Sequence, residues 1–444
     1  MRTRSGIGQV AHVLAPLAER LDARAGEART FAVRLWDGSE LPPPGGAAPV
    51  VTLVVRSPAA LGRVVREPNE VGLGRAWVTG ELDVEGDLEQ ALGAGEAMRG
   101  LPFGVRDKLA ALSLARRLGA LRLRAPEPPG SEARLSGRRH SLRRDRAAVR
   151  HHYDVSNAFF RIVLGPTMVY SCAYFADPDE GLDAAQERKL DVVCRKLRLQ
   201  PGERFLDVGC GWGSLVLHAA ERYGVHAVGI TLSEPQAELA RERAAAAGVA
   251  DRCEIRVADY RELHDGPYDK IASIGMVEHV GAGRLGEYAR TLRSLLRPGG
   301  LLLNHGITRA SPRAWDDKSF VARFVFPDGE LESVDTIVRE LEQAGLEVRD
   351  VESLREHYAL TLRHWLANLA AAREQAIAEA GEERERIWRL YMTGAARSFE
   401  KGDISVHQVL AAAPGSQGLP LARLDTSRTG AGARDALTET SVAE

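Results

Sequence analysis

FLDVGCGWG, residues 205–213, decides the fold of this 444-residue chain. Its apolar first residues predict a short buried strand, and Leu215–Tyr223 predicts a helix directly after the glycines. Glycines permit positive φ in such a turn and let the backbone approach a ligand closely. The spacing is G-x-G-x-G, which differs from the G-x-G-x-x-G of dinucleotide-binding turns. The segment therefore predicts a strand, a turn and a helix that bind a cofactor at the turn.

Strands and helices alternate along the chain after this unit. Short apolar strands separated by helices favour a parallel, doubly wound sheet with helices on both faces. We therefore expect an α/β, Rossmann-like domain. The expected strands are Phe205–Val208, His226–Ile230, Ile255–Val257, Lys270–Gly275 and Leu301–His305, and the expected helices are Leu215–Tyr223, Pro235–Ala247, Leu285–Leu296, Thr361–Ala380 and Arg384–Phe399.

Changes in composition predict four regions. Residues 1–104 predict a small α+β domain with strands at Phe31–Trp36, at Val50–Val55 and within Ala76–Val84. Residues 105–150 predict a basic helical linker, and residues 151–425 predict the α/β domain. Residues 426–444 are rich in small polar side chains and predict a disordered tail.

The overall composition excludes several classes of protein. The chain has 59 Lys+Arg, 61 Asp+Glu and 44% hydrophobic residues, which argues against global disorder and against a uniformly basic nucleic-acid binder. The four cysteines form no CxxC pair, so we expect no metal site and a reducing compartment. We expect no signal peptide and no span, because no run of about 20 apolar residues occurs. The expected location is cytoplasmic.

The basic segment at residues 105–150 holds 13 basic and four acidic side chains, a local charge of +9. One interpretation is a solvated linker. The other is attraction to anionic lipid, worth about 1 kcal/mol per basic residue near a charged bilayer. No aromatic residue lies among these arginines to stack on bases, so we expect no nucleic-acid partner.

The glycine-rich turn resembles the first motif of class I S-adenosylmethionine (SAM) methyltransferases, whose acid at the Asp207 position lies near the methionine amino end. Residues 229–236 read GITLSEPQ and lack the acid that holds ribose in dinucleotide-binding domains. Either a hydroxyl or an amide, such as Thr231 or Gln236, then holds the ribose, or the cofactor is not bound in the usual way. Ser233 is placed to cap the helix that begins at Pro235. We expect Asp259 to bond the adenine and Tyr260 to stack on it.

Seven segments in order resemble the cyclopropane-fatty-acyl-phospholipid synthases and the mycolic acid cyclopropane synthases. They are HYDVSN at 152–157, YSCAYF at 170–175, the glycine-rich turn, GITLSEPQ at 229–236, ADYR at 258–261, GMVEHVG at 275–281 and NHGI at 304–307. The resemblance is clear from residue 151 to residue 399. It is weaker in the first hundred residues, where it rests on GLGRAW at 72–77.

The resemblance implies SAM-dependent methylene transfer to the cis double bond of an unsaturated phospholipid acyl chain in a bilayer. The implied product is a cyclopropane ring. The implied cofactor contacts are Tyr153, Tyr170, Ser171, Asp207, Gly209, Gly211, Gly213, Thr231, Leu232, Gln236, Asp259 and Tyr260. The resemblance also implies a bicarbonate ion held by Cys172, Glu278, His305, Ile307 and Tyr358, with Cys172 and Ile307 contributing chiefly backbone groups.

This chemistry makes sense for residues of these types. No base can activate an alkene by deprotonation, so the enzyme must align the double bond with the sulfonium methyl. The resulting carbocation requires an apolar pocket closed to water, with aromatic faces and a carboxylate to stabilise it. Bicarbonate, oriented by Glu278 and His305, would then remove a proton from the new methyl and close the ring.

Plainer interpretations exist for each residue taken singly. Glu278 and His279 suit an ordinary loop, His305 suits a hydrogen-bonded core position, and Cys172 suits apolar packing. The last long helix carries no cysteine at residues 391–399, which excludes a thiol nucleophile from that helix.

Several functional alternatives stay open. The same methyl transfer with a different proton loss would give a methylene-branched chain, which a partner reductase would convert to a methyl branch. A small-molecule or RNA methyltransferase and a non-catalytic lipid carrier are less favoured. We expect a peripheral contact with the inner membrane face through the basic linker, and we also expect a homodimer.

Overall fold

The computed structural model describes residues 9–25, 29–99, 104–120, 126–153, 155–311, 316 and 318–415. The predicted tail at 426–444 lies outside the described residues. Contacts divide the chain into two compact units. Unit 1 comprises Met1–Arg134, Asp316–Val325 and Glu374–Gly394, and unit 2 comprises Leu135–Trp315, Phe326–Arg373 and Ala395–Glu444.

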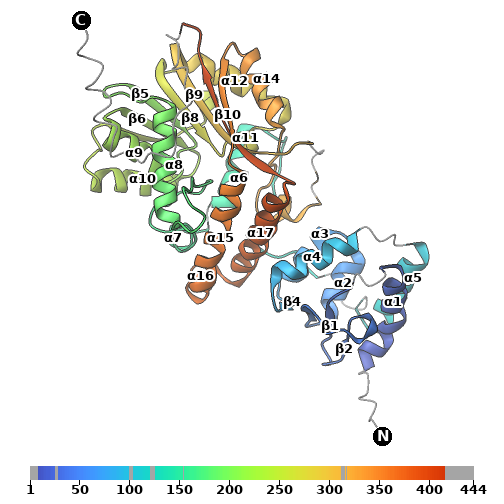
Figure 1. Ribbon diagram of the computed structural model, residues 1–444. Helices are drawn as coiled ribbons and strands as arrows, with labels where there is room; N and C mark the ends of the chain where they lie inside the picture. The colour runs from blue at the N-terminus through green and yellow to red at the C-terminus, as the bar shows by residue number, and fades with distance from the viewer. Residues whose placement is uncertain are drawn as a thin grey trace, which may run out of the picture. The chain divides into compact units, whose positions relative to one another are not determined.

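Unit 2 is built on a seven-stranded sheet with the order β10-β11-β9-β8-β5-β6-β7 (Figure 1). Strands β5 to β9 pair in parallel, as the alternation of strands and helices predicted. The sequence analysis did not predict β10 or β11, and β11 runs antiparallel to both of its neighbours. The strands are β5 (Arg204–Val208), β6 (His226–Thr231), β7 (Cys253–Val257), β8 (Tyr268–Ile274), β9 (Leu296–Thr308), β10 (Glu347–Ser353) and β11 (Ser405–Ala412).

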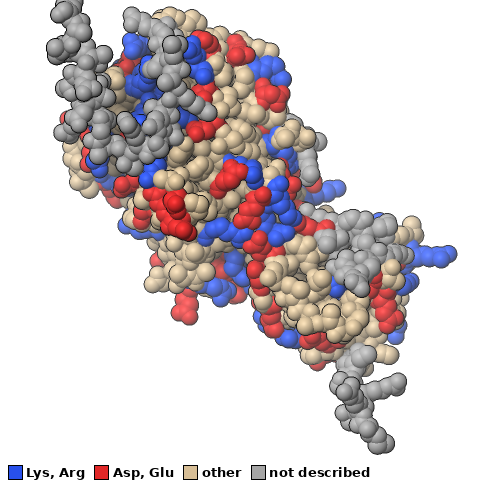
Figure 2. Space-filling model, viewed as in Figure 1, with Lys and Arg blue, Asp and Glu red and all other residues tan. Residues whose placement is uncertain are grey.

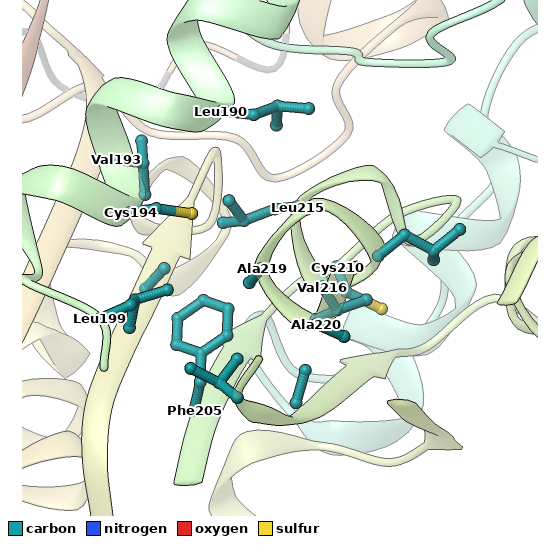
Figure 3. Packing of buried hydrophobic residues seen from close by; sticks show 14 of the residues in the cluster. Leu190, Val193, Cys194, Leu199, Phe205, Cys210, Leu215, Val216, Ala219 and Ala220 are labelled. Atoms are coloured by element: carbon teal, nitrogen blue, oxygen red, sulfur yellow. The ribbon is translucent and has the colours of Figure 1, made fainter. Parts of the chain in front are cut away.

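Helices cover both faces of this sheet, with α8, α9 and α10 on one side and α12 and α14 on the other (Figure 1). Successive residues of a strand point to opposite faces, so Phe205 packs with the first group and Leu206 with the second. Figure 3 shows Phe205 among apolar side chains of α8 and α9. The helices of unit 2 are α6 (Leu142–Tyr153), α7 (Asn157–Leu164), α8 (Leu182–Lys196), α9 (Ser214–Tyr223), α10 (Glu234–Ala246), α11 (Val277–Val280), α12 (Leu285–Leu295), α14 (Val334–Gln343) and α15 (Arg355–Ala371).

Unit 1 contains a four-stranded sheet with the order β2-β1-β3-β4. The predicted strands at Phe31–Trp36 and Val50–Val55 are present, but Ala76–Val78 end a helix and only the following residues form β4. The Asn69 side chain caps the N-terminus of that helix by accepting hydrogen bonds from the backbone amides of Val71 and Gly72. The elements are α1 (Gln9–Ala25), β1 (Ala32–Arg34), β2 (Glu40–Leu41), β3 (Thr52–Val55), α2 (Pro58–Arg66), α3 (Glu70–Val78), β4 (Leu82–Glu85), α4 (Leu88–Arg99), α5 (Val105–Arg117), α13 (Phe320–Phe324), and α16 (Arg373–Ala380) from its second residue.

The unit boundaries differ from those expected from composition. The predicted basic linker is divided, because α5 belongs to unit 1 and α6 to unit 2. The first part of α17 (Glu382–Lys401) also belongs to unit 1. Its Arg386 lies over the Trp77 ring at 4.3 Å and donates to the Trp77 carbonyl at 2.6 Å. These contacts, 309 residues apart in the chain, explain why a boundary based on composition was wrong here.

No helix among the described residues is long and apolar enough to cross a bilayer.

The turn after β5 gives a prediction about stability. Gly213 has φ of 82°, and a Cβ there would lie 2.9 Å from the Ala240 Cβ. Gly248 has φ of 69° but no neighbour within 4 Å of the same position. Gly248→Ala should cost about 1–2 kcal/mol from backbone strain alone, whereas Gly213→Ala should cost about 1–3 kcal/mol more from overpacking. Urea unfolding followed by circular dichroism measures both, and equal losses would contradict this packing role for Gly213.

Candidate functional site

A cavity opens where the parallel strands of unit 2 end. The carboxyl ends of β5, β6 and β8, the residues after β7, and side chains of α6 and α8 line it. Doubly wound sheets bind their ligands at this edge. All predicted cofactor residues except Gly213 line the cavity. They are Tyr153, Tyr170, Ser171, Asp207, Gly209, Gly211, Thr231, Leu232, Gln236, Asp259 and Tyr260.

The glycine-rich turn is tied to the neighbouring strand. The amides of Gly209 and Cys210 both donate to the Ile230 carbonyl, at 3.0 and 2.9 Å. Gly209 has φ of 83°, and a Cβ there would lie 2.6 Å from the Met276 side chain, which also lines the cavity. A larger residue at position 209 would therefore narrow the cavity. Gly213 instead allows α9 and α10 to pack closely, so its predicted contact with the cofactor is not found in the cavity lining.

Two buried charged groups, Asp207 and Lys189, line the cavity near β5, and Gln186 is buried on the same helix as Lys189 without lining the cavity. Asp207 is 3% exposed, and its Oδ1 has no hydrogen-bond partner among the described residues. Lys189 of α8 donates from Nζ to the Ser171 hydroxyl at 3.0 Å. Gln186, one turn earlier, donates to the Ser171 carbonyl at 2.9 Å. The sequence analysis missed Gln186 and Lys189, although two polar residues three positions apart on the core-facing side of a helix were a readable signal.

The other end of the cavity carries the groups predicted for ribose and adenine. The Thr231 hydroxyl donates to Gln236 Oε1 at 2.7 Å, which fixes the amide, and Ser233 caps α10 as predicted. The Arg261 guanidinium donates to both oxygens of Asp259, at 2.8 and 2.7 Å. Asp259 is thus already part of an ion pair, a feature that its predicted bond to adenine did not include.

The five residues predicted for the anion site do not line this cavity. The Ile307 amide donates to Glu278 Oε1 at 2.7 Å. The Cys172 thiol lies 3.7 Å from the Leu354 carbonyl, at the start of the helix that carries Tyr358. Glu278 Oε2 and His305 Nε2 are buried and have no hydrogen-bond partner among the described residues. Two of the predicted groups therefore keep a polar atom available for a ligand.

A chain of hydrogen bonds sets the tautomer of His305. Lys196 can only donate, and its Nζ lies 2.7 Å from Gln408 Oε1. The amide nitrogen of Gln408 therefore faces His305, at 3.1 Å from Nδ1, and donates to it. A neutral imidazole that accepts at Nδ1 carries its proton on Nε2. The partnerless Nε2 of His305 is thus a hydrogen-bond donor, which the sequence did not reveal because Lys196 and Gln408 are distant in the chain.

Burial determines the charge state of these groups. Desolvation raises the pKa of Glu278 to about 7 and lowers the pKa of His305 to about 3. His305 is therefore neutral at physiological pH, while Glu278 exchanges a proton near neutrality. Burial also raises the pKa of the Cys172 thiol, so this residue is no thiolate nucleophile. Glu278 is the one of these three that is suited to acid–base chemistry.

A series of neighbouring aromatic rings extends from the cavity wall to Tyr358, one of the predicted anion residues. Tyr170 lies in the cavity wall, 6.0 Å from Tyr153 and 5.2 Å from Trp365 by ring centroids. Trp365 in turn lies 6.1 Å from Tyr358. Such faces stabilise a nearby cation without acting as nucleophiles.

No group of three or more His, Cys, Asp or Glu side chains in the described part of the chain could hold a metal ion. The strand order, the glycine-rich turn and the cavity at the carboxyl edge of the sheet define a Rossmann-like SAM-dependent methyltransferase.

Comparisons with known proteins narrow this class. Residues 140–409 match the model of the mycolic acid cyclopropane synthetase family, and the chain belongs to this family. It is 44% identical over 404 residues to a probable fatty acid methyltransferase of Pseudomonas putida, covering 89% of this chain and 96% of that relative. It is 34% identical over 414 residues to the tuberculostearic acid methyltransferase UfaA1 of Mycobacterium tuberculosis, covering 90% and 92%.

Solved structures agree. The mycolic acid cyclopropane synthase CmaA1, complexed with S-adenosylhomocysteine (SAH) and CTAB, superposes with a TM-score of 0.57 at 38% identity, covering 60% of this chain and 98% of that one. The chain is therefore a SAM-dependent methyltransferase of the family that modifies fatty acyl chains.

The raised pKa of Glu278 predicts a change of stability with pH. The folded state holds this proton up to about pH 7, whereas the unfolded state loses it near pH 4.5, so the buried carboxyl lowers stability progressively as pH rises between these values. Glu278→Gln removes this loss. Relative to the native chain, its free energy of unfolding should rise by about 2–3 kcal/mol between pH 5 and pH 8.

Urea unfolding at the two pH values measures the effect. Glu242→Gln, on the exposed side of α10, is the matched control and should show no such rise. An unchanged difference between Glu278→Gln and the native chain at both pH values would contradict the burial of an ionisable group here.

Proposed function

We propose that this chain transfers a methylene unit from SAM to the cis double bond of an unsaturated phospholipid acyl chain and forms a cyclopropane ring. The observation that carries the proposal is the pairing of a cofactor cavity with an acid–base group, Glu278, on the short helix α11 whose His279 and Val280 line that cavity. The relatives named above act on fatty acids by their descriptions, which supports an acyl acceptor.

The residues of this chain would divide the work as follows. SAM supplies an electrophilic methyl group. The turn at Gly209 and Gly211 and the side chains of Thr231 and Gln236 position the cofactor. The buried aromatic rings exclude water, which would otherwise convert a carbocation to an alcohol, and they stabilise positive charge on the acyl chain. In this proposal Glu278 takes part in proton removal, together with a base bound beside it.

We propose bicarbonate as the base that acts beside Glu278. The fit is good at two atoms, because Glu278 Oε2 and His305 Nε2 are buried and partnerless among the described residues. A second anion next to a carboxylate is costly, but with its pKa near 7 Glu278 can be protonated and donate a hydrogen bond to bicarbonate. The Ile307 amide, expected to bind the ion, donates to Glu278 Oε1 instead and would have to be shared.

A second product has its own support. The relative described as a tuberculostearic acid methyltransferase covers most of this chain, which favours the alternative in which a different proton is lost and a methylene branch forms. This product would need a reductase partner to become a methyl branch. The two outcomes share the methyl transfer and differ only in which proton the base removes.

We further propose that α5 attaches the enzyme to an anionic bilayer. Val105, Leu109 and Leu112 recur at helical spacing and are 74%, 60% and 40% exposed. Arg106, Lys108, Arg116 and Arg117 are exposed on the same helix. An apolar stripe with flanking cations is typical of helices that lie in the headgroup region.

The structure changes which part of the basic segment can serve a membrane. Arg144 donates to Asp328 at 2.9 Å, and Arg139 pairs with Glu330 and Asp328. These two charges are neutralised inside unit 2. Acidic side chains are intermixed with the basic ones over the face shown in Figure 2. The expected homodimer stays a prediction.

The product can be identified in a bacterial host that makes unsaturated phospholipids. Expression should yield acyl chains one CH2 unit heavier, visible by mass spectrometry of the fatty acids. Cyclopropane and methylene products have equal mass, but only the methylene branch takes up hydrogen under mild hydrogenation, and NMR distinguishes them directly. Glu278→Gln should reduce product by about 10²–10⁴-fold. Full turnover by this variant would overturn the assignment of Glu278, and unmodified lipids with the native chain would overturn the function.

Liposome sedimentation tests the role of α5. Leu109→Gln with Leu112→Gln should weaken binding to phosphatidylglycerol vesicles by about tenfold or more, because two apolar side chains no longer enter the bilayer. Leu73→Gln, at a 48% exposed leucine of α3, is the matched control and should bind normally. Replacing Arg139 and Arg144 should lower the free energy of unfolding, because their ion pairs are lost, and should have a smaller effect on the affinity for vesicles. Unchanged binding by the α5 variant would contradict this surface.

A further inference from the structure

Lys189 is an unusual residue to find in a cofactor cavity wall. It is 2% exposed and lines the cavity, and its one hydrogen-bond partner among the described residues is the Ser171 hydroxyl at 3.0 Å. An ammonium group has three donors, and buried lysines are normally paired with an acid. Burial lowers the pKa of Lys189, while the Asp207 carboxylate opposes that change. The protein therefore bears the cost of burying a cation that its own side chains satisfy only in part.

Asp207 has the opposite charge and is also buried with a polar atom that the described residues do not satisfy. It lines the same cavity at the carboxyl end of β5, with Oδ1 partnerless among the described residues. Burial raises the pKa of Asp207, and the nearby Lys189 ammonium counteracts the rise. One wall of the cavity thus presents a buried positive and a buried negative group beside the Gly209 turn.

We propose that Lys189, with the Ser171 hydroxyl it contacts, binds the α-carboxylate of the methionine moiety of SAM, beside the α-ammonium that the family resemblance already assigns to Asp207. The amino-acid end of the cofactor is a zwitterion, and the two buried charges match it in sign. The carboxylate of the ligand would pair with the Lys189 ammonium, and the ammonium of the ligand would pair with the Asp207 carboxylate. Lys189 is a binding residue in this account and takes no part in the methyl transfer.

The sheet supports this direction of the cofactor. Asp207, Thr231 and the residue pair Asp259–Tyr260 follow β5, β6 and β7, which are adjacent strands. Neighbouring strands lie about 4.8 Å apart, so β5 and β7 are separated by about 10 Å along this edge. An adenosyl group with its amino-acid end at β5 and its adenine near β7 spans such a distance.

Calorimetric titration of the full chain with three ligands tests the proposal. SAH carries the whole amino-acid end, decarboxylated SAH lacks only the carboxylate, and methylthioadenosine lacks both charged groups. Lys189→Met should weaken SAH binding at least tenfold and change the affinities for the other two ligands less than twofold. The native chain should bind decarboxylated SAH at least tenfold more weakly than SAH.

Lys196→Met provides the matched control. Lys196 is a second buried lysine on α8, but it pairs with Glu352 and Gln408 and does not line the cavity. Its replacement should leave the ratio of the SAH and methylthioadenosine affinities unchanged. Lys189→Gln, which keeps a hydrogen-bond donor for Ser171, repeats the test if the methionine variant does not fold.

Two results would overturn the proposal. Equal losses for all three ligands would show that Lys189 only supports the structure, and equal affinities of the native chain for SAH and decarboxylated SAH would show that no group recognises the carboxylate. The binding experiment contains no lipid, so it stands whichever acyl product forms. Failure of the native chain to bind SAH at all would instead contradict the cofactor assignment.

Discussion

The backbone turn between β5 and α9 is the constraint on which the site depends. Two amides of the turn are bound to the Ile230 carbonyl of the adjacent strand, and positive φ at Gly209, Gly211 and Gly213 reverses the chain within a few residues. This leaves the carboxyl edge of the sheet open and directs Asp207 into the cavity. The turn also brings α9 against α10, since the Gly213 position has no room for a side chain. Cofactor binding and helix packing therefore rely on different glycines of the same turn.

Desolvation determines the protonation of several ionisable side chains in unit 2. Burial shifts the pKa of four ionisable side chains, and in each case the shift favours the neutral form. These side chains are Asp207, Lys189, Glu278 and His305. These groups reduce stability in the free protein, which is the usual balance where a site is organised for a charged ligand and for proton transfer. A dry, aromatic surrounding is also what a carbocation requires. In the proposed reaction, the same burial would protect a carbocation from water and tune the pKa of Glu278.

Much of the cofactor site could be predicted, because its residues follow strand ends in a pattern that depends on short stretches of chain. The turn, Thr231, Gln236 and the Asp259–Tyr260 pair all line the cavity as expected. Lys189 was missed because its role depends on its neighbours across the cavity, although its spacing from Gln186 on the core-facing side of α8 was a readable signal of burial. The antiparallel β11 was also missed, since a short apolar run does not indicate which strand it pairs with or in which direction it runs.

The sequence by itself determined the α/β alternation, the glycine-rich turn, the order of the motifs along the chain, and the residue types available for chemistry. Only the tertiary structure decided the charge and environment of those residues. It paired Arg139 and Arg144 with acids and set the tautomer of His305 through Gln408. It also left Asp207 and Glu278 each with an oxygen that has no partner in the described part of the chain. The reason is physical: backbone conformation follows from neighbours in the chain, whereas desolvation and hydrogen bonding depend on groups that meet only after folding.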